Sequence, residues 1–187
     1  MEQASRLTVI ADEVKNCTAC VLHEQRKNTV FHRGNPASRL VFIGEAPGAN
    51  EDEQGLPFVG KAGKLLDNMI KAMKYEPDDV YVCNICKCRP PGNRKPLPEE
   101  MDACKPFLQR QLEEVKPKVI VALGATATEG LLGTGLGITK RRGKWGSWQG
   151  IDVMPTFHPS YCLRNPTSKQ DVWADLQLVM SKLKEVS

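Results

Sequence analysis

Four short runs of apolar, largely β-branched residues alternate with segments of helical periodicity, and this alternation constrains the fold more than any other feature. The runs cover residues 40–43, 80–83, 119–123 and 153–157. They are almost continuously hydrophobic, without the strict alternation of half-exposed strands, which is typical of strands buried on both faces. We therefore expect an α/β fold with a parallel sheet covered by helices on both sides.

Four helices are expected around these strands. Residues 62–73 carry one apolar face at helical spacing. Residues 98–115 begin with a proline and two glutamates, which favour the first turn of a helix. Two more helices are expected from about residue 125 and over residues 168–184.

A single domain over residues 1–187 accounts for this pattern, because no repeat or low-complexity linker divides the chain. The composition, 41% hydrophobic and 26% charged, is typical of a globular protein. The longest apolar run is far too short to span a membrane, and the first residues do not resemble a signal peptide. We expect a cytoplasmic protein without a membrane partner.

The loops that follow the four strands hold the residues best suited to chemistry. In parallel α/β folds ligands bind at the carboxyl ends of the strands, so residues 44–48, Asn84, residues 124–125 and residues 158–160 are expected to form one site. The glycines of 44–48 permit close approach to a ligand, or mark a plain turn. They match neither a Walker loop nor a dinucleotide fingerprint, which disfavours a nucleotide-triphosphate site.

Three side-chain groups near these loops have both a functional and an ordinary explanation. The acidic residues 51–53 would repel DNA phosphates, but one carboxylate could face a developing positive charge or orient a water. Phe58 could stack on a base or belong to the core. His158 could donate a hydrogen bond to an anionic leaving group, or simply cap a helix.

The net charge of +4 permits nucleic-acid binding without demanding it. Its distribution is more informative, because Lys140, Arg141, Arg142 and Lys144 cluster without an acidic neighbour. Such a cluster suits DNA phosphates, and a solvated loop is the alternative.

Seven cysteines in an intracellular chain indicate metal binding, catalysis or burial rather than disulfides. Cys17 and Cys20 form a CxxC pair, and Cys88 and Cys104 lie far along the chain. Four thiolates from these two regions could bind a tetrahedral zinc or a [4Fe–4S] cluster, and the spacing does not separate the two. Cys83 and Cys86 form a second CxxC that competes as ligands. Inert buried thiols are the alternative, and they are the expectation for Cys162.

Taken together, these segments resemble family 4, the thermostable-type iron–sulfur uracil-DNA glycosylases. Each motif is weak alone, but their joint order from Cys17 to Arg164 is specific. The matching segments are residues 44–48 with Glu51 and Asp52, residues 55–63, Asn84, residues 87–91, Ala103 with Cys104, and residues 158–160 with Leu163 and Arg164.

The resemblance implies a four-stranded parallel sheet between helices, a three-layer sandwich. It also implies a [4Fe–4S] cofactor held by Cys17, Cys20, Cys88 and Cys104, with Cys83 and Cys86 left as non-ligands. The implied activity is to flip uracil out of DNA and hydrolyse its N-glycosidic bond, leaving an abasic site for base excision repair.

The same resemblance assigns roles to individual residues. The implied uracil pocket consists of Glu45, Ala46, Phe58, Asn84 and His158. The implied catalytic residues are Glu51, near the scissile bond, and His158, on the departing base.

DNA contacts follow in the same way. Leu163 would fill the space left by the flipped base. Phosphates would be held by Lys61, Lys140, Arg141, Arg142, Ser160 and Arg164. The expected partner is uracil-containing DNA, single- or double-stranded, bound by a monomer that in a prokaryote associates with the nucleoid.

Three rivals remain. Residues 140–143 also resemble the basic loop of a branch that traps DNA covalently through a histidine, but no histidine follows that loop here. A mismatch glycosylase acting on hypoxanthine or xanthine would usually lack the acid at Glu51. A DNA-binding module with a metal centre and no catalysis would need neither Glu51 nor His158.

Overall fold

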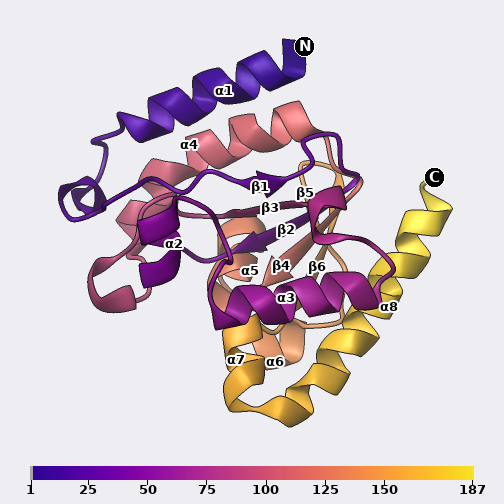
Figure 1. Cartoon of the computed structure of the whole chain (residues 1–187). Coiled ribbons are helices and arrows are strands. Elements are labelled where there is room, and N and C mark those ends of the chain that lie inside the picture. The colour runs from indigo at the N-terminus through magenta and orange to yellow at the C-terminus, as the bar shows by residue number, and fades with distance from the viewer. Residues whose placement is uncertain (1) are drawn as a thin grey trace.

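The computed structural model describes residues 2–187, and a six-stranded mixed sheet runs through its middle (Figure 1). The spatial order is β1-β3-β2-β4-β6-β5. The central strands β3, β2, β4 and β6 are parallel, as the apolar runs predicted. The strands are β1 (Arg33–Gly34), β2 (Leu40–Gly44), β3 (Tyr81–Asn84), β4 (Val119–Leu123), β5 (Gly146–Trp148) and β6 (Ile151–Thr156).

The two edge strands correct the expected count of four. Both pair antiparallel, β1 with β3 and β5 with β6. They contain two and three residues, and none of these is fully buried. Segments this short and this exposed carry no hydrophobic periodicity, so the sequence pattern could not reveal them.

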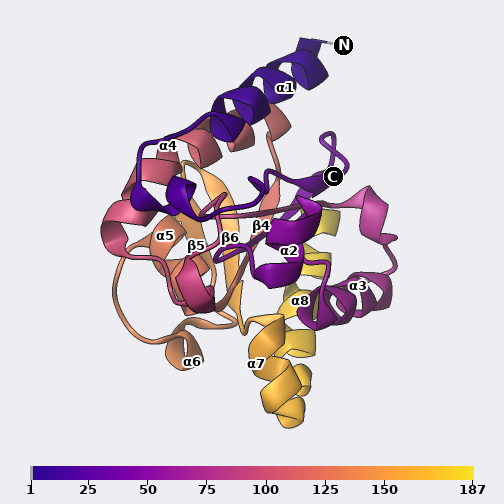
Figure 2. The same ribbon diagram turned by 60° about the vertical axis from the view of Figure 1, so that its left-hand side comes forward.

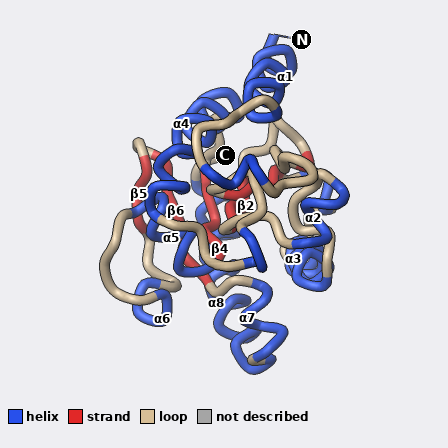
Figure 3. The backbone as a smooth tube through the Cα atoms, turned by 90° about the vertical axis from the view of Figure 1, so that its left-hand side faces the viewer, coloured by secondary structure: helices blue, strands red, loops and turns tan. Residues whose placement is uncertain are grey.

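Helices cover both faces of the sheet (Figures 1 and 2). Successive residues of a strand point to opposite faces. Leu40 and Phe42 of β2 accordingly pack in one cluster with residues of α3 and α8, whereas Val41 and Ile43 pack in another with residues of α4 and α5. The tube in Figure 3 shows the strands between these helical layers. The three-layer sandwich is therefore confirmed.

All four predicted helices are present, with bounds that differ by at most about two residues. They are α3 (Lys61–Ala72), α4 (Pro98–Val115), α5 (Gly124–Leu132) and α8 (Lys169–Glu185). Four others were not predicted: α1 (Glu2–Lys15), α2 (Ala49–Gln54), α6 (Ile138–Arg141) and α7 (Pro159–Arg164). Short 3-10 turns are Val21–Glu24, Pro77–Asp79, Pro91–Asn93 and Pro166–Ser168.

Helix α1 lies alongside α4 and away from the sheet (Figures 1 and 2). It is mostly polar, and it buries only Leu7, Ile10 and Val14. These three lie on one narrow stripe at helical spacing, which matches a helix that packs on another helix rather than on a sheet.

The strand order places a ligand crevice between β2 and β4. From β2 the chain crosses to β3 on one side, and from β4 it crosses to β6 on the other. This reversal is the point where open parallel sheets leave a cleft at their carboxyl ends. None of the helices in residues 2–187 combines the length and apolar character of a membrane span.

Candidate active site

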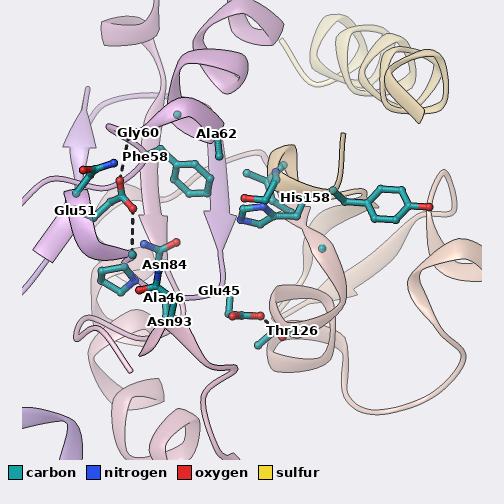
Figure 4. A pocket seen from close by; sticks show the side chains of 18 of the residues that line it. Glu45, Ala46, Glu51, Phe58, Gly60, Ala62, Asn84, Asn93, Thr126 and His158 are labelled. Carbon is teal, nitrogen blue, oxygen red and sulfur yellow. Dashed lines mark hydrogen bonds between the residues drawn. The ribbon is translucent and has the colours of Figure 1, made fainter. Parts of the chain in front are cut away.

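A cleft of about 630 Å³ opens at the carboxyl ends of the parallel strands. It brings together residues from all four loops that were expected to meet there, together with α2 and the start of α3 (Figure 4). The predicted site residues that line it are Glu45, Ala46, Glu51, Phe58, Lys61, Asn84, His158, Ser160 and Arg164.

Phe58 is buried and has a left-handed backbone, with φ of +55°. For a bulky residue this conformation is a genuine outlier, so the surrounding structure must hold it. Two glycines allow it: a Cβ at Gly63 would stand 1.8 Å from the Phe58 carbonyl oxygen, and one at Gly44 would stand 2.5 Å from its ring. The ring lies 5.5 Å from the His158 ring at 29°. Phe58 therefore forms a fixed aromatic wall in the cleft.

Arg33 holds the loop that carries Phe58 against α3. Its Nε donates to the Pro57 carbonyl at 2.9 Å, and its Nη2 donates to Asp67 of α3 at 2.7 Å. Sequence reasoning missed Arg33, because its partners are 24 and 34 residues away and no local pattern connects them.

Asn84, the last residue of β3, is only 2% exposed. Its side-chain Oδ1 is buried and has no hydrogen-bond partner among the described residues. Unpaired buried acceptors cost about 1–3 kcal/mol, so they are rare without a functional reason. Figure 4 shows the amide beside Phe58, on the side of the cleft where Glu51 and Ala46 lie. The cleft thus contains an acceptor that lacks a donor.

His158 is the N-cap of α7, and its orientation fixes its tautomer. Its Nδ1 accepts a hydrogen bond from the Ser160 backbone N–H at 3.0 Å, so the ring proton sits on Nε2. Burial, aided by the Arg164 charge, lowers its pKa to about 4. Gly124 leaves the ring its space, because a Cβ there would lie 3.0 Å from the His158 Cβ. At neutral pH His158 is therefore an uncharged Nε2–H donor.

This depressed pKa predicts a measurable loss of stability in acid. The unfolded chain binds a proton at His158 below about pH 6.5, and the folded chain does so only near pH 4. Between these values the unfolded state holds more protons, so the free energy of unfolding falls as pH falls. At pH 4.5 the cost should be about 2–3 kcal/mol. Denaturant unfolding of His158→Gln should lose this part of the slope, whereas parallel curves for variant and parent would refute the assignment.

Glu51 is more constrained than the sequence suggested. Its Oε1 accepts from the Gly48 N–H at 3.0 Å, and its Oε2 accepts from the Val59 and Gly60 N–H groups at 3.2 Å each. The carboxylate therefore caps α2 and holds the loop that carries Phe58, while still lining the cleft. Its neighbour Asp52 is buried and accepts from the Lys27 N–H at 2.9 Å, which is a structural contact.

Glu45 is held by a residue that the sequence did not single out. Thr126 of α5 donates its hydroxyl to Glu45 Oε2 at 2.5 Å (Figure 4). This bond fixes the carboxylate at the β4 side of the cleft. Thr126 lies in α5 directly after residues 124–125, which were expected to contribute, and its hydroxyl was the available signal.

Comparisons with known proteins agree with this geometry. The family model described as the uracil DNA glycosylase superfamily matches residues 31–177. The type-4 uracil-DNA glycosylase of Thermotoga maritima is 47% identical over 96% of this chain and 95% of its own length. The chain belongs to the type-4 uracil-DNA glycosylase family. The type-4 enzyme of Saccharolobus solfataricus is 42% identical over 95% of this chain and 86% of its own.

The type-5 branch is more distant. A type-5 uracil-DNA glycosylase of Pyrobaculum aerophilum is 33% identical over 68% of this chain and 63% of its own length. Membership of the type-4 uracil-DNA glycosylase family therefore agrees with the expectation drawn from the joint order of the motifs.

The four cysteines expected to bind metal in this type-4 chain line one small apolar cavity. Cys17 and Cys20 follow α1, Cys88 follows β3, and Cys104 belongs to α4. Polar hydrogens point at three of their sulfurs: Ala19 N–H to Cys17 at 3.4 Å, Arg26 to Cys88 at 3.4 Å, and Lys87 N–H to Cys104 at 3.3 Å. Hydrogen bonds of this kind favour thiolate ligands.

The fifth cysteine in that cavity is Cys86, which was expected not to be a ligand. Its thiol lies beside Cys104 and lowers the pKa of that thiol. Across residues 2–187, no three His, Cys, Asp or Glu side chains are arranged to hold a single metal ion. Cys83 lies in the core, as does Cys162. The ligand set therefore stays a prediction.

The residues expected to contact DNA fall into two groups. Lys61, Ser160 and Arg164 line the cleft, and Leu163 is exposed on α7. Residues 140–142 do not line it, and two of them have internal partners. Arg142 binds the buried Asp175 of α8 through Nε at 3.0 Å and Nη2 at 2.6 Å. Arg141 donates to the Gly133 carbonyl at 2.7 Å. Of this cluster, Lys140 and Lys144 are exposed.

Proposed function

We propose that this protein removes uracil from DNA by hydrolysing its N-glycosidic bond, which leaves an abasic site. The observation that supports this most is the buried, unpartnered Asn84 Oδ1 beside the Phe58 ring. A flat ligand that stacks on Phe58 and offers a donor to Asn84 would satisfy both. A flipped nucleobase has this shape and this edge.

The edge chemistry selects uracil over cytosine. Uracil carries a hydrogen on N3 and can donate it to Asn84 Oδ1, whereas cytosine N3 has no hydrogen and would face a second acceptor. A wrong base would leave buried polar groups unpaired, which discriminates more strongly than shape does. Glu45, fixed by Thr126, would help to exclude the methyl group of thymine.

Bond breaking would depend on His158 and Glu51. Cleavage leaves positive charge on the sugar and negative charge on the departing uracil. The Nε2–H of neutral His158 would donate to the uracil anion without transferring its proton. A carboxylate has about four lone-pair sites, and backbone donors take three at Glu51. The remaining site would face the sugar cation or the attacking water.

The residues around the cysteine cavity fit a [4Fe–4S] cluster held by Cys17, Cys20, Cys88 and Cys104. When bound, the cluster would act as a cross-link between the segment after α1 and the chain around β3 and α4. Arg26 would help to join the same two segments, since it donates to the Cys17 carbonyl at 2.8 Å and to the Cys88 sulfur.

We propose that DNA lies across the mouth of the cleft. Lys61, Ser160 and Arg164 would hold phosphates beside the flipped nucleotide, and Leu163 would fill the vacated stack. Lys140 would add a more distant contact. Because Arg142 is paired with Asp175, its loss should reduce stability rather than DNA affinity. We expect a monomer that acts on single- or double-stranded uracil-containing DNA and, in a prokaryote, associates with the nucleoid.

Uracil release from a labelled oligonucleotide tests the proposal, with Asn84→Asp as the diagnostic variant. We expect the wild type to release uracil, and the variant to lose at least about 100-fold in single-turnover rate. The new carboxylate can accept the exocyclic amine of cytosine, so cytosine release should become detectable. Hypoxanthine-containing DNA serves as the alternative substrate. No uracil release by the wild type would refute the function, and an unchanged base preference in Asn84→Asp would refute the reading role.

A further inference from the structure

Lys87 is completely buried and borders the cysteine cavity, and the uracil chemistry described above does not use its amine. Its Nζ donates to the backbone carbonyl of Asn84 at 2.8 Å and to Oε1 of Gln111 at 2.6 Å. Lysine is almost never fully buried unless it is paired, and the hydrogen-bond partners of the Lys87 amine within residues 2–187 are these two neutral oxygens. A buried amine kept for two neutral oxygens calls for an explanation in the site.

The lysine is held from behind by α4. Gln111 of that helix donates its Nε2 to the Tyr81 hydroxyl at 2.7 Å and to the Phe31 carbonyl at 3.1 Å. The Phe31 ring lies 5.6 Å from the lysine Nζ. Both polar atoms of the Gln111 amide are therefore hydrogen-bonded, which fixes its orientation. The Lys87 Nζ is in turn held by the Gln111 oxygen, the Asn84 carbonyl and the Phe31 ring.

Backbone hydrogen bonds to the loop after β2 hold the chain that follows Asn84. Ile85 N–H donates to the Gly44 carbonyl at 2.9 Å, and Cys86 N–H donates to the Glu45 carbonyl at 3.1 Å. The Asn84 carbonyl belongs to the same peptide as the Ile85 N–H, and Lys87 is its side-chain partner. Lys87 therefore completes the hydrogen bonds of the peptide that follows the base-reading residue.

The Asn84 amide needs this support, because its Oδ1 has no partner of its own. A side chain without such a bond is placed by its backbone and by packing against Phe58 and Gly44. We propose that Lys87 is a positioning residue for base recognition, acting through Asn84 without touching the base. This inference rests on the proposed function, in which Asn84 reads uracil.

Two variants test it from different elements. Lys87→Met removes the amine but keeps an apolar stem of similar length, and Gln111→Met removes the support on α4 without altering residues 84–88. Gln109→Met, an exposed position on the same helix, is the matched control. Single-turnover uracil release and inhibition by free uracil are measured, together with iron content and circular dichroism.

A displaced Asn84 should lower the rate constant and raise the inhibition constant of uracil, each by about 10- to 100-fold in Lys87→Met, since a shift of about 1 Å can cost that much. Gln111→Met should show a smaller change in the same direction, and Gln109→Met none. At saturating enzyme the single-turnover rate constant does not depend on the fraction of folded molecules, whereas circular dichroism and iron content report poor folding, so the two causes separate in each variant.

A double variant decides whether Lys87 acts through Asn84. Combined with Asn84→Ala, Lys87→Met should add less than threefold to the loss seen in Asn84→Ala alone. Fully multiplicative losses, or a wild-type rate and uracil inhibition constant in Lys87→Met, would overturn the inference while leaving the proposed function intact. A wild-type protein that releases no uracil would overturn both.

Discussion

Replacing His158 with alanine should lower the single-turnover rate of uracil release by about 100-fold or more, with little change in DNA affinity. The Nε2–H of this residue meets a full negative charge only when the glycosidic bond breaks, so its hydrogen bond strengthens in the transition state. The Nδ1 bond to the Ser160 N–H keeps the proton on the useful nitrogen. Rapid-quench measurement with enzyme in excess isolates this step.

Two controls accompany that variant. His23→Ala replaces a histidine that lies outside the cleft but borders the cysteine cavity, so its rate is compared at equal iron content and should then match the parent. Glu51→Ala should also slow cleavage, but its three backbone bonds mean that the loop carrying Phe58 loosens as well. We therefore expect Glu51→Ala to raise the inhibition constant of uracil more than His158→Ala does, because His158→Ala removes a single hydrogen-bond donor and leaves the Phe58 loop held. Near-parental rates in both variants would remove the basis of the mechanism.

Replacing Cys88 with alanine should abolish the metal centre. The aerobically purified parent is expected to be brown, with an absorbance shoulder at about 400 nm and about four iron atoms per chain. Cys88→Ala should be colourless and give a much lower soluble yield, because the segment after α1 loses its link to the sheet. Iron analysis and the visible spectrum measure this directly.

The matched comparison is Cys86→Ala, in the same cavity and two residues away. We expect Cys86→Ala to keep its iron, although it removes a contact that lowers the pKa of Cys104. If Cys86→Ala loses iron and Cys88→Ala keeps it, the ligand set is wrong. Stoichiometric zinc in a colourless parent protein would instead contradict the cluster itself.

The sequence predicted the parts of this fold and site that depend on local patterns. Residues 119–123 were predicted as a buried strand from five consecutive apolar residues, and they form the fully buried β4. Asn84 and His158 could be placed at one edge because the carboxyl ends of parallel strands meet there. Helix α1 could not be predicted from its weak apolar stripe, since its three buried residues contribute only when α4 is already in place.

The internal partners were beyond sequence reasoning for a different reason. Arg142 looked like a phosphate ligand because no acid lies nearby along the chain, yet Asp175 reaches it from 33 residues away. In the same way, the acids at residues 51–53 looked alike, but Asp52 is buried under a loop and Glu51 lines the cleft. The sequence shows where charged side chains cluster along the chain, whereas the fold decides which of them are paired with a partner distant in sequence.

The position of α1 has a consequence for biosynthesis. This helix and the cysteines after it are synthesised well before their docking partners on α4, including Cys104. Domains with such distant pairings cannot complete those contacts early. Helix α1 should therefore stay undocked from α4, with the Cys17 and Cys20 thiols exposed, during much of translation. Insertion of the proposed cluster would then be a late maturation event, and a cell short of iron should accumulate chains with a folded sheet and a protease-sensitive segment around α1.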